Sequence, residues 1–196
     1  MTSELARTNF RKARTHISVG DHISTGSQAE IQYIMDNLIT GSTSPNKRGE
    51  IEKIKEKSRV GEIAKVKPTK VDLYLEDDSG RRFLFDIKTA KPNIGSFKEF
   101  KRTLLEWVAV SLLDDPEADV NTLIAIPYNP YEPKPYNRWT MRGMLDISVE
   151  LKVAGEFWDF LGGEGTYRDL LECFERVGTE MSSEIDEYFE KFKGII

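Results

Sequence analysis

Apolar residues recur along the chain at two different spacings, and their order predicts a mixed α/β fold. Residues 27–40 and 96–114 repeat apolar side chains every three or four positions, as the buried face of a helix does. Residues 71–75 (VDLYL) and 81–89 (RRFLFDIKT) alternate instead, and the turn sequence EDDSG between them predicts a β-hairpin. The apolar run 122–126 predicts a buried strand. We therefore expect a central mixed sheet flanked by helices.

Capping signals define where the two long helices should begin. Ser27 and Ser96 each precede a Glu by three residues, the spacing of a capping box, and Gly41 can end the first helix. Between the first helix and the hairpin, residues 49–58 predict a basic, exposed helix or a segment that orders on binding. Its apolar positions are too few to anchor it firmly.

The segment 128–143 (YNPYEPKPYNRWTMRG) combines aromatic, proline and basic residues and predicts an irregular loop. Ordered, aromatic-rich loops of this length are usually functional. Residues 145–153 (LDISVELKV) then alternate as a further strand would. The loop is the expected place for contacts with a partner.

The end of the chain predicts three short amphipathic helices, around 155–161, 167–177 and 183–192, with capping-box spacing again at Thr166. We expect a core over 1–154, which carries the loop, and a helical C-terminal extension over 155–196 packed on it. A chain of 196 residues suits one such domain with an appendage.

Composition narrows the class of protein. With 39% hydrophobic and 31% charged residues, the chain is too apolar to be disordered and too charged to be a membrane protein. No apolar run reaches the roughly 18 residues of a spanning helix, and the N-terminus lacks the apolar core of a signal peptide. The only cysteine, Cys173, can form no internal disulfide. We expect a cytoplasmic protein with no membrane partner and no small-molecule cofactor.

The net charge of −5 hides an asymmetry between the two parts of the chain. Residues 156–196 hold 11 acidic and 4 basic side chains, whereas residues 1–155 hold 22 acidic and 24 basic ones. Residues 47–70 alone carry nine Lys or Arg against four Glu. A basic region beside an acidic tail suits a polyanionic partner, although Lys/Glu-rich stretches also form ordinary solvated helix faces.

One group of residues in the predicted hairpin could carry chemistry. Asp72 lies on its first strand, and Asp86 and Lys88 share one face of its second strand. Two carboxylates from neighbouring strands form a hard oxygen site suited to Mg²⁺, with the Ile87 carbonyl as a natural further ligand. Lys88 could approach a metal-bound water or a scissile phosphate. Phosphodiester hydrolysis needs this combination of charge neutralisation and an activated water.

In the order of its elements and in Asp72 with Asp86-Ile87-Lys88, the chain resembles the PD-(D/E)xK nuclease superfamily. Val71 precedes the first acidic residue where the consensus has Pro, a part of the motif that is loose across the superfamily. Residues 88–107 and 157–178 resemble type II restriction endonucleases of the TdeIII kind. That resemblance implies Mg²⁺-dependent cleavage of double-stranded DNA at a palindromic site of the GGNCC type, by a homodimer that matches the symmetry of the site.

Further candidate site residues each have a plainer alternative. Superfamily members often add an acidic residue from the first helix to the metal site, and Glu30 is placed to do so, but a capping role also explains it. Arg138 and Arg142 could each read a guanine in the major groove, or pair with Glu132 or Asp146 and hold the loop. The candidates for phosphate contact, each of which could instead shape a turn or be solvated, are Lys91, Asn93, Lys98 and Lys101.

Two other functions remain open from the sequence. In a non-catalytic nucleic-acid-binding protein, Asp86 and Lys88 would form only a surface ion pair. A repair or junction nuclease would use the same chemistry but would need mainly phosphate contacts. The aromatic, arginine-containing loop 128–143 favours a sequence-specific enzyme.

Overall fold

The computed structural model describes residues 1–67, 70–90, 96–136, 141 and 143–191. Its elements alternate between helices and strands, as the two spacings of apolar residues predict. In chain order they are α1 (Thr2–Ala6), β1 (Lys12–Ser18), β2 (His22–Ser24), α2 (Thr25–Thr40), α3 (Lys47–Lys57), β3 (Ile63–Lys65), β4 (Lys70–Glu76), β5 (Arg82–Ile87), α4 (Phe97–Asp114), β6 (Val120–Ile126), β7 (Leu151–Val153), α5 (Gly155–Gly162), α6 (Thr166–Glu180) and α7 (Ser182–Glu190).

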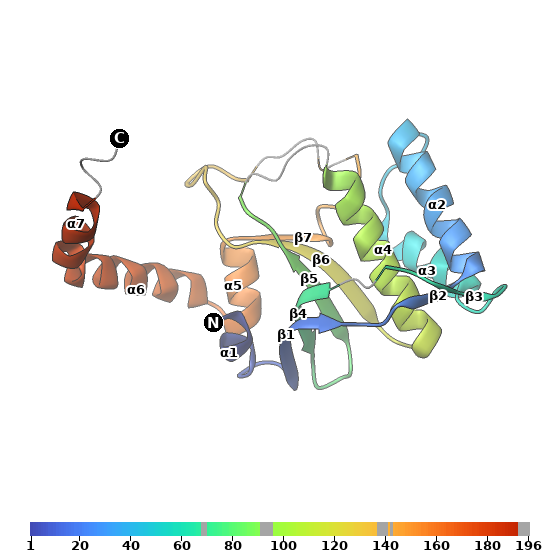
Figure 1. Ribbon diagram of the computed structural model, residues 1–196, viewed down its shortest axis with the longest axis horizontal. Helices are drawn as coiled ribbons and strands as arrows, with labels where there is room; N and C mark the ends of the chain where they lie inside the picture. The colour runs from blue at the N-terminus through green and yellow to red at the C-terminus, as the bar shows by residue number, and fades with distance from the viewer. Residues whose placement is uncertain (68–69, 91–95, 137–140, 142, 192–196) are drawn as a thin grey trace.

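A five-stranded mixed sheet in the order β1-β4-β5-β6-β7 forms the centre of the molecule (Figure 1). The predicted hairpin is confirmed: β4 and β5 are antiparallel, with Leu73 opposite Phe85 and Glu76 opposite Arg82. Strands β5, β6 and β7 run parallel. Helix α4 is the crossover from β5 to β6, and residues 127–150 connect β6 to β7. The sheet therefore changes from antiparallel to parallel at β5, the strand that carries Asp86.

Helices cover the two faces of the sheet in different ways. On one face, α4 packs against β6, and α2 and α3 pack against α4 on its outer side (Figure 1). On the other face, α5 packs Phe157 edge-on against Phe85 of β5. The alternation of β4 and β5 thus places Leu73 and Phe85 on the α5 side, and Leu84 with Asp86 on the α4 side.

The helix boundaries differ from the predicted ones where the capping signals were misassigned. Helix α2 begins at Thr25, two residues before the predicted start. Its N-cap is Ser24 in place of Ser27, because the Ser24 hydroxyl accepts a hydrogen bond from the Ser27 N–H at 2.9 Å. Ser96 stands at the start of α4 but makes no side-chain capping bond. Thr166 is the first residue of α6, whose N-cap is Gly165. Gly41 ends α2 with a left-handed φ of 70°, as expected.

Two further sequence expectations are corrected, and one strand has no counterpart among them. The sequence does not predict strand β1, because its residues are mostly exposed and alternate weakly. The strand expected over 145–153 shrinks to Leu151–Val153, since the preceding residues turn so that the Glu150 N–H donates to the Asp146 carbonyl. Helix α3 is firmly anchored, since Asn46 caps it and Lys47, Glu50 and Ile54 are buried along it.

The three C-terminal helices are confirmed, but they differ in how they pack. Helix α5 belongs to the core through Phe157, Trp158 and Leu161. In contrast, α6 and α7 bury no residue and extend away from the sheet (Figure 1). No helix in the described part of the chain is long and apolar enough to cross a membrane.

Candidate active site

Strand β4 leaves the regular sheet ladder at Asp72. On the β5 side, the regular pairs end at Leu73 and Phe85, and the Asp72 Oδ2 carboxylate oxygen accepts the Ile87 N–H at 2.8 Å. On the β1 side, the pairs pass from Thr15–Leu73 to Ile17–Val71 without including Asp72. A side-chain oxygen has therefore taken the place of a backbone acceptor between β4 and β5.

Asp86 and Lys88 meet beside Asp72. The Lys88 ammonium lies 2.6 Å from Asp86 Oδ1 and 4.7 Å from the centre of the Phe100 ring on α4. Asp86 is buried, whereas about a third of the Asp72 side chain and of the Lys88 side chain is exposed. The structure thus brings together the three residues that the sequence selected and leaves two of them open to solvent.

The surroundings of Asp86 disfavour its ionised form. Burial raises the pKa of Asp86, the Lys88 ammonium lowers it, and the negative charge of Asp72 raises it again, so that the net pKa lies above its ordinary value. One ammonium does not compensate two carboxylates at a buried position. Additional positive charge at this point would relieve the repulsion.

Glu30 does not join this pair. It lies half-buried on α2, a helix that packs against α4 and not against the sheet. Among the residues that the structure describes, no three His, Cys, Asp or Glu side chains gather closely enough to hold a metal. Its alternative role in a capping box is also wrong, since Ser24 caps the helix. Glu50 of α3, another carboxylate near the basic segment, pairs with Lys101 and not with Asp72 or Asp86.

His16 of β1 is the residue near the site that the sequence analysis missed. Its Nδ1 lies 3.9 Å from Asp72 Oδ1, and its φ of 54° is left-handed although it lies within a strand. No spacing in the sequence could have indicated this, because the contact depends on the pairing of β1 with β4. The conformation, rare for residues other than glycine, could be found only in the structure.

Of the two lysines of α4 that were predicted to contact phosphate, only one is accessible to solvent. Lys98 is exposed, but Lys101 is completely buried and cannot contact DNA. The prediction assumed that α4 has one solvated face. The helix instead lies between the sheet and the pair α2 and α3, so that its polar side is covered as well.

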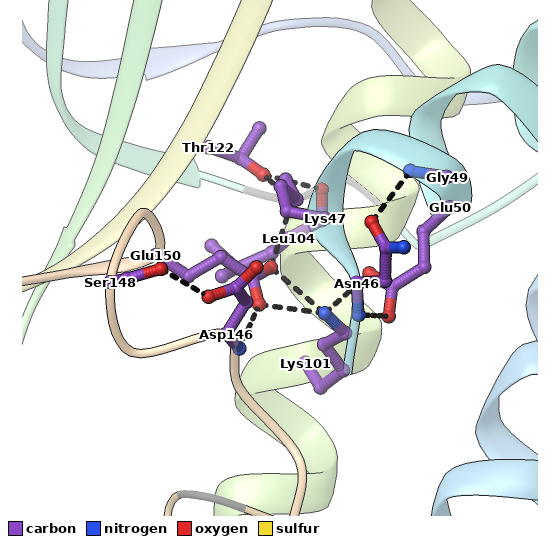
Figure 2. A network of polar contacts seen from close by, with 10 residues as sticks. All are labelled: Asn46, Lys47, Gly49, Glu50, Lys101, Leu104, Thr122, Asp146, Ser148 and Glu150. Atoms are coloured by element: carbon purple, nitrogen blue, oxygen red, sulfur yellow. Dashed lines mark hydrogen bonds and ion pairs between the residues drawn. The ribbon is translucent and has the colours of Figure 1, made fainter. Parts of the chain in front are cut away.

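Lys101 belongs to a buried cluster of four charged side chains, the Lys47–Glu50–Lys101–Glu150 cluster (Figure 2). Its ammonium lies 2.7 Å from Glu150 Oε2 and also pairs with Glu50. Lys47 lies 3.0 Å from Glu150 Oε1 and donates to the Thr122 hydroxyl of β6. The formal charges balance within the cluster, which therefore fastens α3, α4 and the segment before β7 to one another.

The pKa directions in the cluster follow from its charges. Burial lowers the pKa of Lys47, and Glu150 opposes that effect without reversing it. Burial would raise the pKa of Glu150, but the ammonium groups of Lys47 and Lys101 outweigh it and hold the pKa below its ordinary value. Glu150 is therefore ionised at neutral pH.

The remaining predicted contact residues, namely Lys91, Asn93, Arg138 and Arg142, lie outside the described residues. Their roles stay predictions.

A central mixed sheet with helices on both faces and a polar site on β4 and β5 defines an α/β domain whose architecture is compatible with that of restriction endonucleases. The chain belongs to the HinfI family: the family model described as "Type II restriction endonuclease, HinfI" matches residues 1–178. The family is thus confirmed at this level, while the TdeIII likeness and the PD-(D/E)xK assignment stay predictions.

Curated relatives carry the same designation. The chain is 30% identical over 125 residues to the type II restriction enzyme HgiCII of Herpetosiphon aurantiacus, a match that covers 63% of this chain and 45% of the relative. It is 27% identical over 160 residues to the type II restriction enzyme MjaII of Methanocaldococcus jannaschii, covering 76% of this chain and 43% of the relative. The chain therefore spans less than half the length of the curated relatives it matches.

Proposed function

We propose that this chain cleaves double-stranded DNA as a Mg²⁺-dependent type II restriction endonuclease of the PD-(D/E)xK kind. The observation that carries the proposal is the convergence of Asp72, Asp86 and Lys88 at the opened end of β4 and β5, in a chain of the HinfI family. The family favours this function over a repair nuclease or a non-catalytic binding protein.

The donor set fits a divalent cation with a preference for oxygen. Asp72 and Asp86 supply carboxylates, and the Ile87 carbonyl between Asp86 and Lys88 is the further ligand that we propose. The raised pKa of Asp86 supports this fit, because the two carboxylates face each other with too little positive charge between them. Mg²⁺ bound there would neutralise the developing charge and lower the pKa of a bound water.

Lys88 has the position of a residue that orients the attacking water. Asp86 and the Phe100 ring hold its ammonium from two sides, while part of the side chain remains open to an incoming phosphate. An ammonium donates hydrogen bonds to water and to phosphate oxygens alike. Lys88 would thus fix the water against the phosphorus and balance the negative charge of the transition state.

Cleavage of a plasmid of known sequence, followed by mapping of the fragments, tests the function and identifies the site. We expect discrete fragments with Mg²⁺ and none with EDTA. The TdeIII resemblance implies cuts at a palindrome of the GGNCC type. Cleavage only of branched DNA, irrespective of its sequence, would show that the protein is a junction nuclease and not a restriction enzyme. No cleavage with any divalent metal would refute both functions.

Lys88→Met is expected to slow cleavage by about 10² to 10⁴-fold, the range for loss of an acid–base partner. The variant should still fold, but with a lower melting temperature, because the buried Asp86 carboxylate loses its cation. Lys152→Met is the matched control, because Lys152 also lies 4.7 Å over a phenylalanine ring, Phe160, but on the α5 side of the sheet. Rates and thermal melts of both variants are measured side by side. A Lys88→Met enzyme as fast as the control would make Lys88 a structural residue.

A homodimer is the assembly that we propose, through the exposed apolar stripe of α6 and α7. A palindrome is matched most simply by a twofold-symmetric dimer, and a stripe of this length is unusual on a monomer. Its flanking residues are acidic, which would also keep the tail off DNA. The stripe comprises Leu171, Phe174, Val177, Met181, Ile185, Tyr188 and Phe189.

Phe174→Glu combined with Ile185→Glu is expected to convert the dimer into a monomer, since each protomer would bury two charges in the interface. Sedimentation equilibrium gives the mass, which should fall from twice 22.4 kDa to that value. Glu175→Ala, on the polar side of α6, serves as the control and should leave the dimer intact. A monomeric wild type would refute the proposed interface.

A further inference from the structure

Strand β1 brings a strained histidine beside the candidate metal site. His16 lies opposite Asp72 where the pairing of β1 with β4 is interrupted, and it adopts a left-handed φ of 54°. Its side chain is 76% exposed, so the strain does not serve to bury the ring. Strained residues of this kind persist only where the surrounding structure imposes them, and they concentrate at functional sites.

Arg14, two residues before His16 on β1, lines an open cleft between β1 and α4. It pairs in register with Tyr74, and both line the cleft together with Ser111 of α4. Tyr74 and Asp72 alternate with buried residues of β4 and share a face, so the cleft begins one pleat away from Asp72. The cleft thus comes within two residues of Asp72 along β4, although its lining does not include Asp72, Asp86 or Lys88.

Some charged side chains of the cleft form ion pairs and others do not. Lys12 pairs with Glu76 at 3.0 Å, and Arg82 pairs with Asp115 at 2.9 Å. Arg14 and Asp114 also line the cleft and are exposed, and neither forms an ion pair with a residue in the described part of the chain. A guanidinium that is open to solvent and without a carboxylate partner is suited to bind an anion with two parallel hydrogen bonds.

We infer that Arg14 and His16 form a binding site for a backbone phosphate of DNA next to the scissile one. The Arg14 guanidinium binds the phosphate oxygens, and the imidazole of His16, whose Nδ1 faces Asp72, offers its other nitrogen to the same strand of DNA. The inference rests on the proposed function for the identity of the ligand. It places β1, an edge strand with mostly exposed residues, along the path of the substrate.

The site has a different energetic signature from base recognition. A contact to phosphate is independent of sequence and releases condensed counterions, so it appears in the salt dependence of binding. Arg14→Ala should weaken binding to any duplex severalfold and reduce the slope of log K against log salt by about one. Arg14→Lys keeps the charge and should keep the slope while losing part of the affinity.

The measurement uses a fluorescent duplex of arbitrary sequence, at several salt concentrations, with Ca²⁺ in place of Mg²⁺ so that the DNA stays uncut. Arg7→Ala is the charge-matched control, because Arg7 does not line the cleft and follows α1, whose Ala6 packs with α5 on the other face of the sheet. The control should bind with the wild-type slope. An Arg14→Ala variant with the slope of the control would overturn the inference.

The role of His16 is tested with variants that distinguish the contribution of its imidazole ring from that of its strained backbone. Glycine adopts a φ of 54° without strain, so His16→Gly should melt no lower than the wild type if the protein tolerates the loss of the ring. Under our inference it nevertheless binds the duplex severalfold more weakly. Asn, which tolerates the left-handed region and offers an amide donor, should recover part of the affinity. A His16→Gly protein with full affinity would remove His16 from the site.

Failure of the inference can be distinguished from failure of the proposed function. A wild type that cleaves DNA, with an Arg14→Ala variant of unchanged slope, refutes the phosphate site alone. A wild type that binds without cleaving, and loses slope in Arg14→Ala, supports the phosphate site and refutes the catalytic proposal. A wild type that binds no duplex refutes both.

Discussion

Asp86→Ala is expected to abolish DNA cleavage while the protein remains folded. Asp86 is the buried carboxylate of the pair, and without it Asp72 alone would have to hold the metal. Metal stabilisation of transition-state charge is worth several kcal/mol, and since each ~1.4 kcal/mol is a factor of ten, the rate should fall by about a thousandfold or more. Binding to DNA, measured with Ca²⁺, should persist or tighten, because a negative charge facing the phosphates is removed. Asp72→Ala should behave in the same way.

The thermal stability of Asp86 variants tests the environment of this carboxylate independently of cleavage. The pKa of Asp86 is raised in the folded protein, so its ionised form costs stability at neutral pH, and the cost disappears as the pH falls through the raised pKa. Asp86→Asn removes that cost and should raise the melting temperature at neutral pH. Asp78→Asn, in the exposed turn of the same hairpin, is the control for both assays. Full Mg²⁺-dependent cleavage by Asp86→Ala would refute the assignment.

The candidate site was predictable because it depends on local patterns. Alternation along β4 and β5 fixes which residues share a face, and the hairpin turn fixes their pairing, so Asp72 and Asp86 had to meet near each other. The lysine two residues after Asp86 then falls on the same side. None of these steps requires knowledge of distant parts of the chain.

The errors concern contacts that only the tertiary structure provides. The helical periodicity predicts a solvated side for α4. In the structure α3 covers that side, and Lys101 is therefore buried. In the same way, the alternation of residues 145–153 indicated a strand, whereas the Glu150 carboxylate is drawn into the interior by two ammonium groups. His16 acquires its role only through the pairing of β1 with β4. Charged residues were taken as surface markers, and this chain buries four of them together.

That burial leads to the second large expected effect, a loss of stability in Lys101→Met. Methionine keeps most of the side-chain volume but removes the ammonium, leaving Glu50 and Glu150 with Lys47 as their only cation in the cluster. Removing one partner of a buried ion pair costs about 3–5 kcal/mol, because an uncompensated charge remains in the interior. In a chain of this length that corresponds to a fall of roughly 10 °C in the melting temperature.

Lys98→Met is the matched control, because Lys98 lies one turn earlier on α4 and is exposed. Its melting temperature should change little, within roughly 0.5 kcal/mol. The double variant Lys101→Met with Glu150→Gln leaves Lys47 and Glu50 in balance, so it should lose less stability than the sum of the two single variants. Additive losses would mean that the four side chains do not act as one cluster.

The pH dependence of unfolding completes the test of the cluster. The pKa of Glu150 is depressed in the folded protein, so the stability it contributes is present above its ordinary pKa of about 4.5 and is lost as the pH falls through the depressed value. Glu150→Gln should therefore be less stable than the wild type at neutral pH and should lose less on acidification. Denaturant unfolding at neutral and acidic pH measures both. If the gap between the two proteins were the same at every pH, Glu150 would contribute through packing and not through its charge.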